Sequence, residues 1–254
     1  MERNIYLDID MDFFVAPIQR ASVDNVRLYQ DVPCSLLPAE PAVSHLRQQG
    51  LRWTADKISC FTNHKTSYIH WWMSKKQNQL LIHIDAHSDM YRNSERDLRL
   101  LHNGNMGCHN YIWYGIRDEY INEVIWVIPD SLSHLLQENQ AESIIHNALI
   151  KEKHVDSKGL HILMECIVIS GETKLIPVRV CTLAQLTDIE GTCAKITIAT
   201  SPEFIPEEAD EFVFELFDAF GVPVSTAENI YKQHKEMLKR TEEEINEAWD
   251  KLKE

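Results

Sequence analysis

The chain has 254 residues, of which 44% are hydrophobic, and this is enough to bury the core of one large domain. Its formal net charge of -14 argues against a nucleic-acid-binding surface. No stretch reaches the roughly 18 apolar residues of a membrane span, and the N-terminus does not have the form of a signal peptide, so we expect a cytoplasmic protein that binds neither nucleic acid nor membrane.

Apolar runs alternate with segments of helical spacing along the chain. Strands are predicted at residues 4–10, 80–85, 123–128, 161–169 and 195–200, and helices at 41–49, 65–77, 131–150, 207–220 and 226–252. This alternation predicts an α/β domain with a mostly parallel sheet and with ligands at the carboxyl ends of its strands.

No repeat or low-complexity linker divides residues 1–222, which we expect to form one domain. The composition changes at Gly221-Val222-Pro223, and residues 223–254 have the charged, narrowly apolar pattern of a helix. We expect this helix to pack on the same domain. Packing against a second subunit, in a homo-oligomer, is the alternative.

The strand predicted at 80–85 runs into three side chains that can bind metal, Asp85, His87 and Asp89. Alternate residues of an extended chain share a face, so these side chains should converge. Asp8, Asp10 and Asp12 repeat the arrangement on the first predicted strand. Carboxylates packed together repel one another unless a cation holds them. The oxygen-rich set suits a site for two manganese or magnesium ions.

Both motifs carry a family resemblance. Asp85-Ala86-His87-Ser88-Asp89 resembles the Asp-Ala-His-x-Asp ligand motif of the arginase and agmatinase ureohydrolases, and Asp8-Ile9-Asp10-Met11-Asp12 resembles their Asp-x-Asp strand. More specifically, the chain resembles the peptide arginase-like branch of this superfamily, grouped with the UPF0489 family. Segments 63–72, 104–109, 126–129 and 197–206 support this resemblance.

The resemblance implies a three-layer arginase-like fold with a permuted strand order. In ordinary arginases the Asp-x-Asp strand follows the Asp-Ala-His-x-Asp strand, whereas here it comes first. A parallel sheet tolerates this change if its strands occupy the same places in space, because site geometry rather than chain order decides the chemistry.

The resemblance also assigns metal ligands. Asp85 would bridge two ions, His87 would bind one of them and Asp89 the other, and His64 would add a further ligand. The first strand allows two registers: in one, Asp10 and Asp12 are ligands and Asp8 orients a catalytic histidine, and in the other the ligands are Asp8 and Asp10. Asp10 is a ligand in both. His83 is expected to be a buried partner of these ligands.

Three residues are candidates for contact with the substrate. Asn105 and His109 lie in a segment that resembles the substrate-binding and proton-transferring segment of arginases, with His102 as an alternative general acid. Glu203 follows the strand predicted at 195–200 and could bind a guanidinium group through both oxygens. It could instead be an ordinary acidic residue at the start of a helix.

The resemblance implies a manganese-dependent hydrolase that converts arginine side chains of a ribosomally synthesised precursor peptide to ornithine and releases urea. Three alternatives remain open. The protein could act on free arginine, agmatine or a related amide, or it could be a non-catalytic peptide-binding scaffold. Asp8-Ile9-Asp10 also resembles the nucleophile strand of haloacid-dehalogenase phosphatases, but that family expects Thr or Val at Asp12 and leaves Asp85 to Asp89 unexplained.

Overall fold

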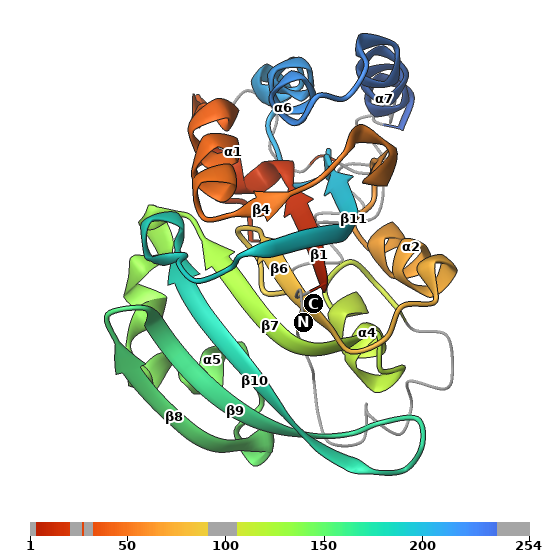
Figure 1. Ribbon diagram of the computed structural model, residues 1–254. Coiled ribbons are helices and arrows are strands. Elements are labelled where there is room, and N and C mark those ends of the chain that lie inside the picture. Colours follow the sequence, from red (N-terminus) through yellow and green to blue (C-terminus); the bar gives the residue numbers. More distant parts are fainter. Residues whose placement is uncertain (1–3, 21–26, 28–32, 91–105, 238–254) are drawn as a thin grey trace, which may run out of the picture.

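A nine-stranded sheet forms the centre of the part of the chain that the computed structural model describes, residues 4–20, 27, 33–90 and 106–237 (Figure 1). Its strands follow in the order β4 (Leu51–Arg52), β11 (Gly191–Ala199), β1 (Asn4–Asp10), β6 (Gln79–Ile84), β7 (Ile121–Ile128), β10 (Thr173–Thr182), β9 (Gly159–Ile167) and β8 (Ile150–Asp156), and β5 (Ile58–Phe61) also pairs with β11. A separate two-stranded sheet joins β2 (Val15–Ala16) to β3 (Ser35–Leu36).

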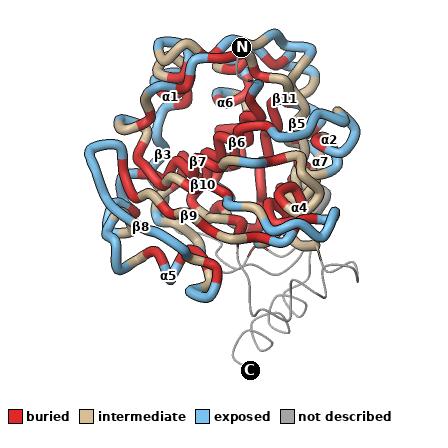
Figure 2. The backbone as a smooth tube through the Cα atoms, turned by 60° about the horizontal axis from the view of Figure 1, so that its bottom comes forward, coloured by how far each residue is buried: buried red, intermediate tan, exposed pale blue. Residues whose placement is uncertain are grey.

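The sheet is mixed and mostly parallel. All pairings from β4 and β5 through β11, β1, β6 and β7 to β10 are parallel, whereas β9 runs antiparallel to both β10 and β8. Every residue of β6 is buried, as expected for a central parallel strand that is covered on both faces. Figure 2 shows the buried central strands and the more exposed β8 at the edge. The chain is therefore an α/β protein, as predicted.

Helices pack on both faces of the sheet. One apolar core joins β1 and β11 to α1 (Ala39–Gln48), α6 (Phe212–Phe220) and α7 (Val224–Met237). A second core joins the sheet to α2 (Thr66–Ser74) and α4 (Tyr111–Arg117). Short 3-10 turns also occur, among them η1 (Met11–Phe14), η2 (Ala55–Lys57), η7 (Leu183–Gln185) and η8 (Glu207–Ala209). This arrangement is compatible with a three-layer fold.

Alternation along β1 decides which side chains reach the second core. Ile5, Leu7 and Ile9 belong to the core shared with α1 and α6, whereas Tyr6 belongs to the core shared with α2 and α4. Since alternate residues of a strand share a face, Asp8 points to the same side as Tyr6. The sequence thus places a carboxylate inside the second core.

All five predicted strands are present, with ends displaced by a few residues, and four of the five predicted helices are confirmed over their described parts. The prediction of one helix at 131–150 is wrong. Four short elements replace it: η4 (Asp130–Leu136), η5 (Glu138–Gln140), α5 (Ala141–Ile144) and η6 (Asn147–Leu149). Serine and asparagine residues in this segment favour turns over helix interiors, so short turns bury its apolar residues along the edge of the second core.

Helix α7 accounts for the described part of the predicted C-terminal helix. Ala227 and Ile230 lie in the first apolar core, so up to Met237 the helix packs on the same domain. Residues 238–254 of the predicted helix lie outside the described part of the chain.

Candidate metal centre

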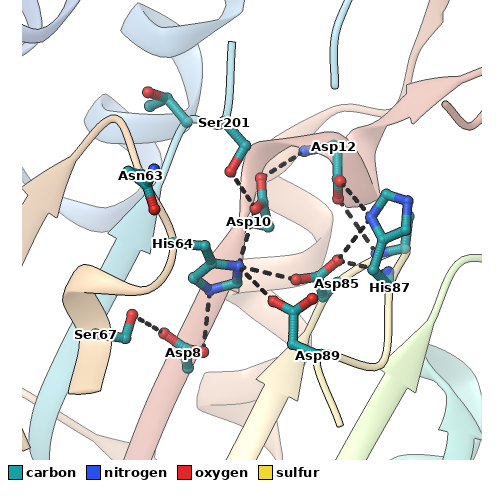
Figure 3. Close-up of polar contacts among 12 residues, drawn as sticks. Asp8, Asp10, Asp12, Asn63, His64, Ser67, Asp85, His87, Asp89 and Ser201 are labelled. Atoms are coloured by element: carbon teal, nitrogen blue, oxygen red, sulfur yellow. Dashed lines mark hydrogen bonds and ion pairs between the residues drawn. The ribbon is translucent and has the colours of Figure 1, made fainter. Parts of the chain in front are cut away.

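The metal-binding side chains come together at the carboxyl edge of the sheet, where β1 and β6 end side by side. Asp8 pairs in register with His83, and Ile9 with Ile84, so Asp10 emerges next to Asp85. His64 reaches the same place from the turn before α2 (Figure 3). The clustering predicted from the two motifs is therefore confirmed.

One part of the cluster surrounds the Nδ1 atom of His64. This nitrogen lies 2.9 Å from Asp10 Oδ2, 3.0 Å from Asp85 Oδ2 and 3.3 Å from Asp89 Oδ2. His64, Asp10 and Asp85 are almost completely buried. Three carboxylates thus converge on one imidazole nitrogen out of contact with bulk water.

A second part of the cluster surrounds His87. Its Nδ1 atom lies 2.8 Å from Asp12 Oδ2 and 3.5 Å from Asp85 Oδ1. Asp85 therefore belongs to both parts: its Oδ2 atom faces His64 and its Oδ1 atom faces His87. One carboxylate lies between two groups of potential ligands.

Close approach in this cluster does not mean hydrogen bonding. Neither ring nitrogen of His64 has a hydrogen-bond partner among the described residues, and Asp85 Oδ2 has none either, although all three atoms are buried. An unsatisfied buried polar atom costs about 1–3 kcal/mol. Oxygen and imidazole ligands that face one another in this way fit a divalent cation. The buried Asp and His groups could therefore hold metal ions.

Asp8 has a different environment, because hydrogen bonds already occupy its oxygens. Four side chains donate to it: Ser67 Oγ at 2.6 Å, Thr197 Oγ1 at 2.5 Å, Tyr111 Oη at 2.6 Å and His83 Nδ1 at 3.1 Å. Its Oδ2 atom also lies 3.0 Å from His64 Nε2. Asp8, His64 and His83 could form a metal-binding group of their own. However, the hydrogen bonds that already occupy the oxygens of Asp8 favour the register in which Asp10 and Asp12 are the ligands.

His83 is fully buried and joins the two motifs, as expected for a partner of the ligands. Its Nδ1 atom contacts Asp8, and its Nε2 atom lies 3.1 Å from the backbone oxygen of His87. This contact fixes the loop that carries His87 against the strand that carries Asp8.

The electrostatic balance of the cluster is negative. It holds five carboxylates, those of Asp8, Asp10, Asp12, Asp85 and Asp89, and three imidazoles, those of His64, His83 and His87. Burial by itself lowers the pKa of His64, but the carboxylates of Asp8 and Asp10 raise it well above its ordinary value. Burial and the charge of Asp85 raise the pKa of Asp89 to about 6. Even three protonated histidines would not neutralise five carboxylates, so bound cations would relieve the repulsion.

Two residues of the site have left-handed backbone conformations. Asp89 has a φ of 46° and Ser201 a φ of 35°, values that non-glycine residues rarely adopt. Ser201 follows β11 and donates a hydrogen bond to Asp10 Oδ2 at 2.5 Å. Conformations of this kind are characteristic of functional sites, where the surrounding structure holds them.

The three residues predicted to contact the substrate, Asn105, His109 and Glu203, differ in their positions relative to the cluster. His109 is exposed and its ring packs close to Gly107, so it does not belong to the buried cluster. Glu203 is buried. Asn105 and His102 lie outside the described residues. The catalytic or binding roles of these residues stay predictions.

Sequence reasoning missed the hydroxyl groups around Asp8 and also missed Cys108. Ser67 lies one helical turn after His64, and Thr197 pairs in register with Asp8, but only the paired strands reveal this proximity. Burial, together with the charges of Asp89 and Glu203, raises the pKa of Cys108 to about 12. This thiol therefore lies beside the cluster in its neutral form.

A further group of potential ligands lies on the surface. His154 and His161 face each other across β8 and β9 with parallel rings 4.7 Å apart, and Asp156 Oδ1 lies 3.0 Å from His161 Nε2. His154 and Asp156 are exposed, unlike the ligands at the sheet edge. Exposed groups of this kind are common without a bound ion.

Comparisons with protein-family models, curated proteins and solved structures found no match to this chain. Among the described residues, the helices are too short or too polar to cross a membrane.

Proposed function

We propose that the protein is a binuclear-metal hydrolase of guanidino groups that converts arginine side chains within a peptide to ornithine and releases urea. The observation that carries the proposal is the position of Asp85, whose two oxygens face two separate groups of ligands. A carboxylate shared between two ions is characteristic of two-metal hydrolases.

In this proposal, one ion is held by Asp10, His64, Asp85 and Asp89, and the other by Asp12, Asp85 and His87. Manganese is the expected metal, because the ligands are carboxylates and imidazoles without thiolates. When bound, the two ions would supply Lewis-acid stabilisation and an activated water for attack on a guanidinium carbon. This assignment explains why the buried atoms His64 Nδ1 and Asp85 Oδ2 lack hydrogen bonds.

The protein side chains would orient the ligands and the substrate. Asp8 Oδ2 lies 3.0 Å from His64 Nε2, so that the other ring nitrogen, Nδ1, faces the remaining carboxylates and could bind a cation. Glu203 would pair with the guanidinium group, and His109 would protonate the leaving amine. Since His109 is exposed, it can exchange protons with solvent.

The proposal includes membership of the arginase superfamily, with a permuted order of strands. The support is that β1, which carries the Asp-x-Asp motif, lies directly beside β6, which leads into Asp-Ala-His-x-Asp. Helices on both faces of a mostly parallel sheet agree with such a fold.

The phosphatase alternative would require Asp8 to attack phosphorus. Asp8 is fully buried, and its oxygens accept hydrogen bonds from three hydroxyl groups and from His83. A carboxylate in this environment is poorly placed as a nucleophile. The structure therefore gives no support to that alternative.

The proposal is tested with metal-free protein reconstituted with MnCl2. The substrates are a synthetic blocked peptide with one internal arginine, free arginine and agmatine. Mass spectrometry should show a peptide lighter by the guanidino carbon, two nitrogens and two hydrogens, with urea released in equal amount. The Asp85→Ala variant should be inactive, whereas Asp156→Asn in the exposed hairpin should keep full activity.

The other outcomes redirect the assignment. Urea from free arginine or agmatine, with no change in the peptide, would indicate a small-molecule ureohydrolase. Manganese binding without turnover of any of the three compounds would contradict guanidino hydrolysis and favour a different amide substrate or a peptide-binding role. Absence of manganese binding would contradict the metal centre itself.

A further inference from the structure

Helix α7 connects to the metal centre through the turn that follows β11. His234, which is fully buried on α7, hydrogen-bonds through Nε2 to Thr200 Oγ1. Thr200 is also tied to β5, because its backbone N–H donates to Phe61 O at 3.1 Å. The next residue is Ser201, which donates to Asp10 Oδ2. Two side-chain hydrogen bonds, joined by the peptide bond between Thr200 and Ser201, therefore link α7 to Asp10.

The other side of this turn is held by a buried ion pair. Arg27 donates from Nε to the backbone oxygen of Pro202 at 3.2 Å, and its guanidinium group pairs with Asp210. Lys235, the residue after His234, lies 3.0 Å from Asp210 Oδ2. The turn is thus fixed at Thr200 by α7 and at Pro202 by Arg27.

The conformation of Ser201 explains why the turn needs this support. A left-handed conformation costs a non-glycine residue about 1–2 kcal/mol, so an unsupported serine would relax to a different φ. Relaxation would withdraw the hydroxyl from Asp10 Oδ2, which is the oxygen that lies 2.9 Å from His64 Nδ1. Fixing the turn therefore fixes a carboxylate of the metal centre.

His234 is an unusual choice for a residue that merely anchors a helix. Its Nδ1 atom is buried without a hydrogen-bond partner among the described residues, and Asp210 Oδ1 is 3.8 Å away. An apolar residue would avoid the cost of about 1–3 kcal/mol that an unsatisfied nitrogen carries. The hydrogen bond to Thr200 explains why an imidazole, and not an apolar side chain, stands at this position.

We propose that His234 is a positioning residue for the metal centre: through Thr200 it holds Ser201 in its left-handed conformation, and Ser201 holds Asp10 in the orientation that binds the ion. The inference rests on the proposed function only in requiring a metal at Asp10. It makes α7 part of the functional site rather than a separate cover on the domain.

The test measures the affinity of metal-free protein for Mn2+ by titration calorimetry, a readout that does not depend on turnover. His234→Leu and Thr200→Val remove the bridge at similar volume and should each weaken binding about tenfold, and Ser201→Ala should weaken it by about 10- to 100-fold, the range for residues that orient metal ligands. Ile230→Ala is the matched control, because Ile230 is a buried apolar residue of α7. It should lower stability without changing Mn2+ affinity.

A double variant tests the route of the effect. If His234 acts through Ser201, then His234→Leu combined with Ser201→Ala should bind Mn2+ as weakly as Ser201→Ala alone, because coupled changes are not additive. Wild-type affinity in His234→Leu, additive losses in the double variant, or an equal loss in Ile230→Ala would each overturn the inference. Wild-type protein that binds no Mn2+ overturns both proposals, whereas binding without hydrolysis contradicts only the proposed reaction.

Discussion

Asp8 and Asp12 are four positions apart in the sequence, but their surroundings have opposite effects on a negative charge. Burial by itself raises the pKa of Asp8, yet the neighbouring imidazoles of His64 and His83 hold it well below its ordinary value. Burial and the carboxylates of Asp10 and Asp85 raise the pKa of Asp12 well above its ordinary value. Folding therefore favours the charged form of Asp8 and disfavours that of Asp12.

This difference predicts opposite effects of two isosteric substitutions on the metal-free protein. Asp8→Asn should lower the free energy of unfolding at neutral pH by about 1–3 kcal/mol, because an amide nitrogen cannot accept a hydrogen bond from a hydroxyl. Asp12→Asn should raise the free energy of unfolding, since it removes one of the repelling carboxylates. Urea denaturation in the presence of EDTA measures both. A larger loss for Asp12→Asn than for Asp8→Asn would contradict this account.

Single residues also mark the limit of prediction from sequence. Alternation along two apolar strands was enough to predict that Asp10, Asp85 and His87 come together, because neighbouring parallel strands end at the same edge. The hydroxyl groups around Asp8 could not be predicted. Ser67, Tyr111 and Thr197 come from two helices and a strand that are distant in the sequence. Nothing in the sequence around each of them indicates a contact with Asp8.

At the scale of elements, the central strands were easier to predict than the edge. Strands β1, β6 and β7 are rich in apolar residues, and the sequence identifies them directly. Strand β10 contains Pro177, which normally argues against a paired strand, and β8 is too polar for an apolar-run criterion. Both were missed, because β10 is held by its pairing with β7 and β9, and β8 by its pairing with β9, and only the fold specifies these neighbours.

The two hairpin connections of β9 offer a matched pair of substitutions. A Cβ atom on Gly159 would overlap the carbonyl oxygen of Val180 on β10, whereas a Cβ atom on Gly171 would meet no atom within 4 Å. Both glycines have positive φ, 123° and 85°. Gly171→Ala should therefore cost only the backbone strain, about 1–2 kcal/mol, and Gly159→Ala should cost about 3 kcal/mol or more, because two strands must separate.

Chemical denaturation of the metal-free variants measures these costs. Mn2+ affinity of the folded variants should be unchanged, because the proposed ligands lie at the ends of β1 and β6, in η1 and in the turn before α2, away from this hairpin. Equal costs for the two glycines would show that backbone strain, rather than the contact with Val180, decides the stability of the hairpin.

At the scale of the whole molecule, the fold gathers charge of one sign. The net charge of the chain is -14, and five carboxylates meet in a single buried cluster at the sheet edge. Strands on both sides of β1 contribute to this edge, and helices pack on both faces of the sheet. Cations bound there would link several elements that otherwise repel one another, so metal binding and global stability should be coupled.

This coupling predicts the effect of metal on thermal unfolding. Mn2+ at about 100 times its dissociation constant adds about 2.7 kcal/mol for each site that binds only the folded protein, which corresponds to a rise in Tm of about 5–10 °C for a chain of this size. Differential scanning calorimetry with and without EDTA measures the shift. Asp85→Ala should abolish most of it, because Asp85 faces both groups of ligands, whereas Asp156→Asn should preserve it. A shift that survives in Asp85→Ala and disappears in Asp156→Asn would mean that the stabilising ion binds to the exposed β8–β9 hairpin instead of the sheet edge.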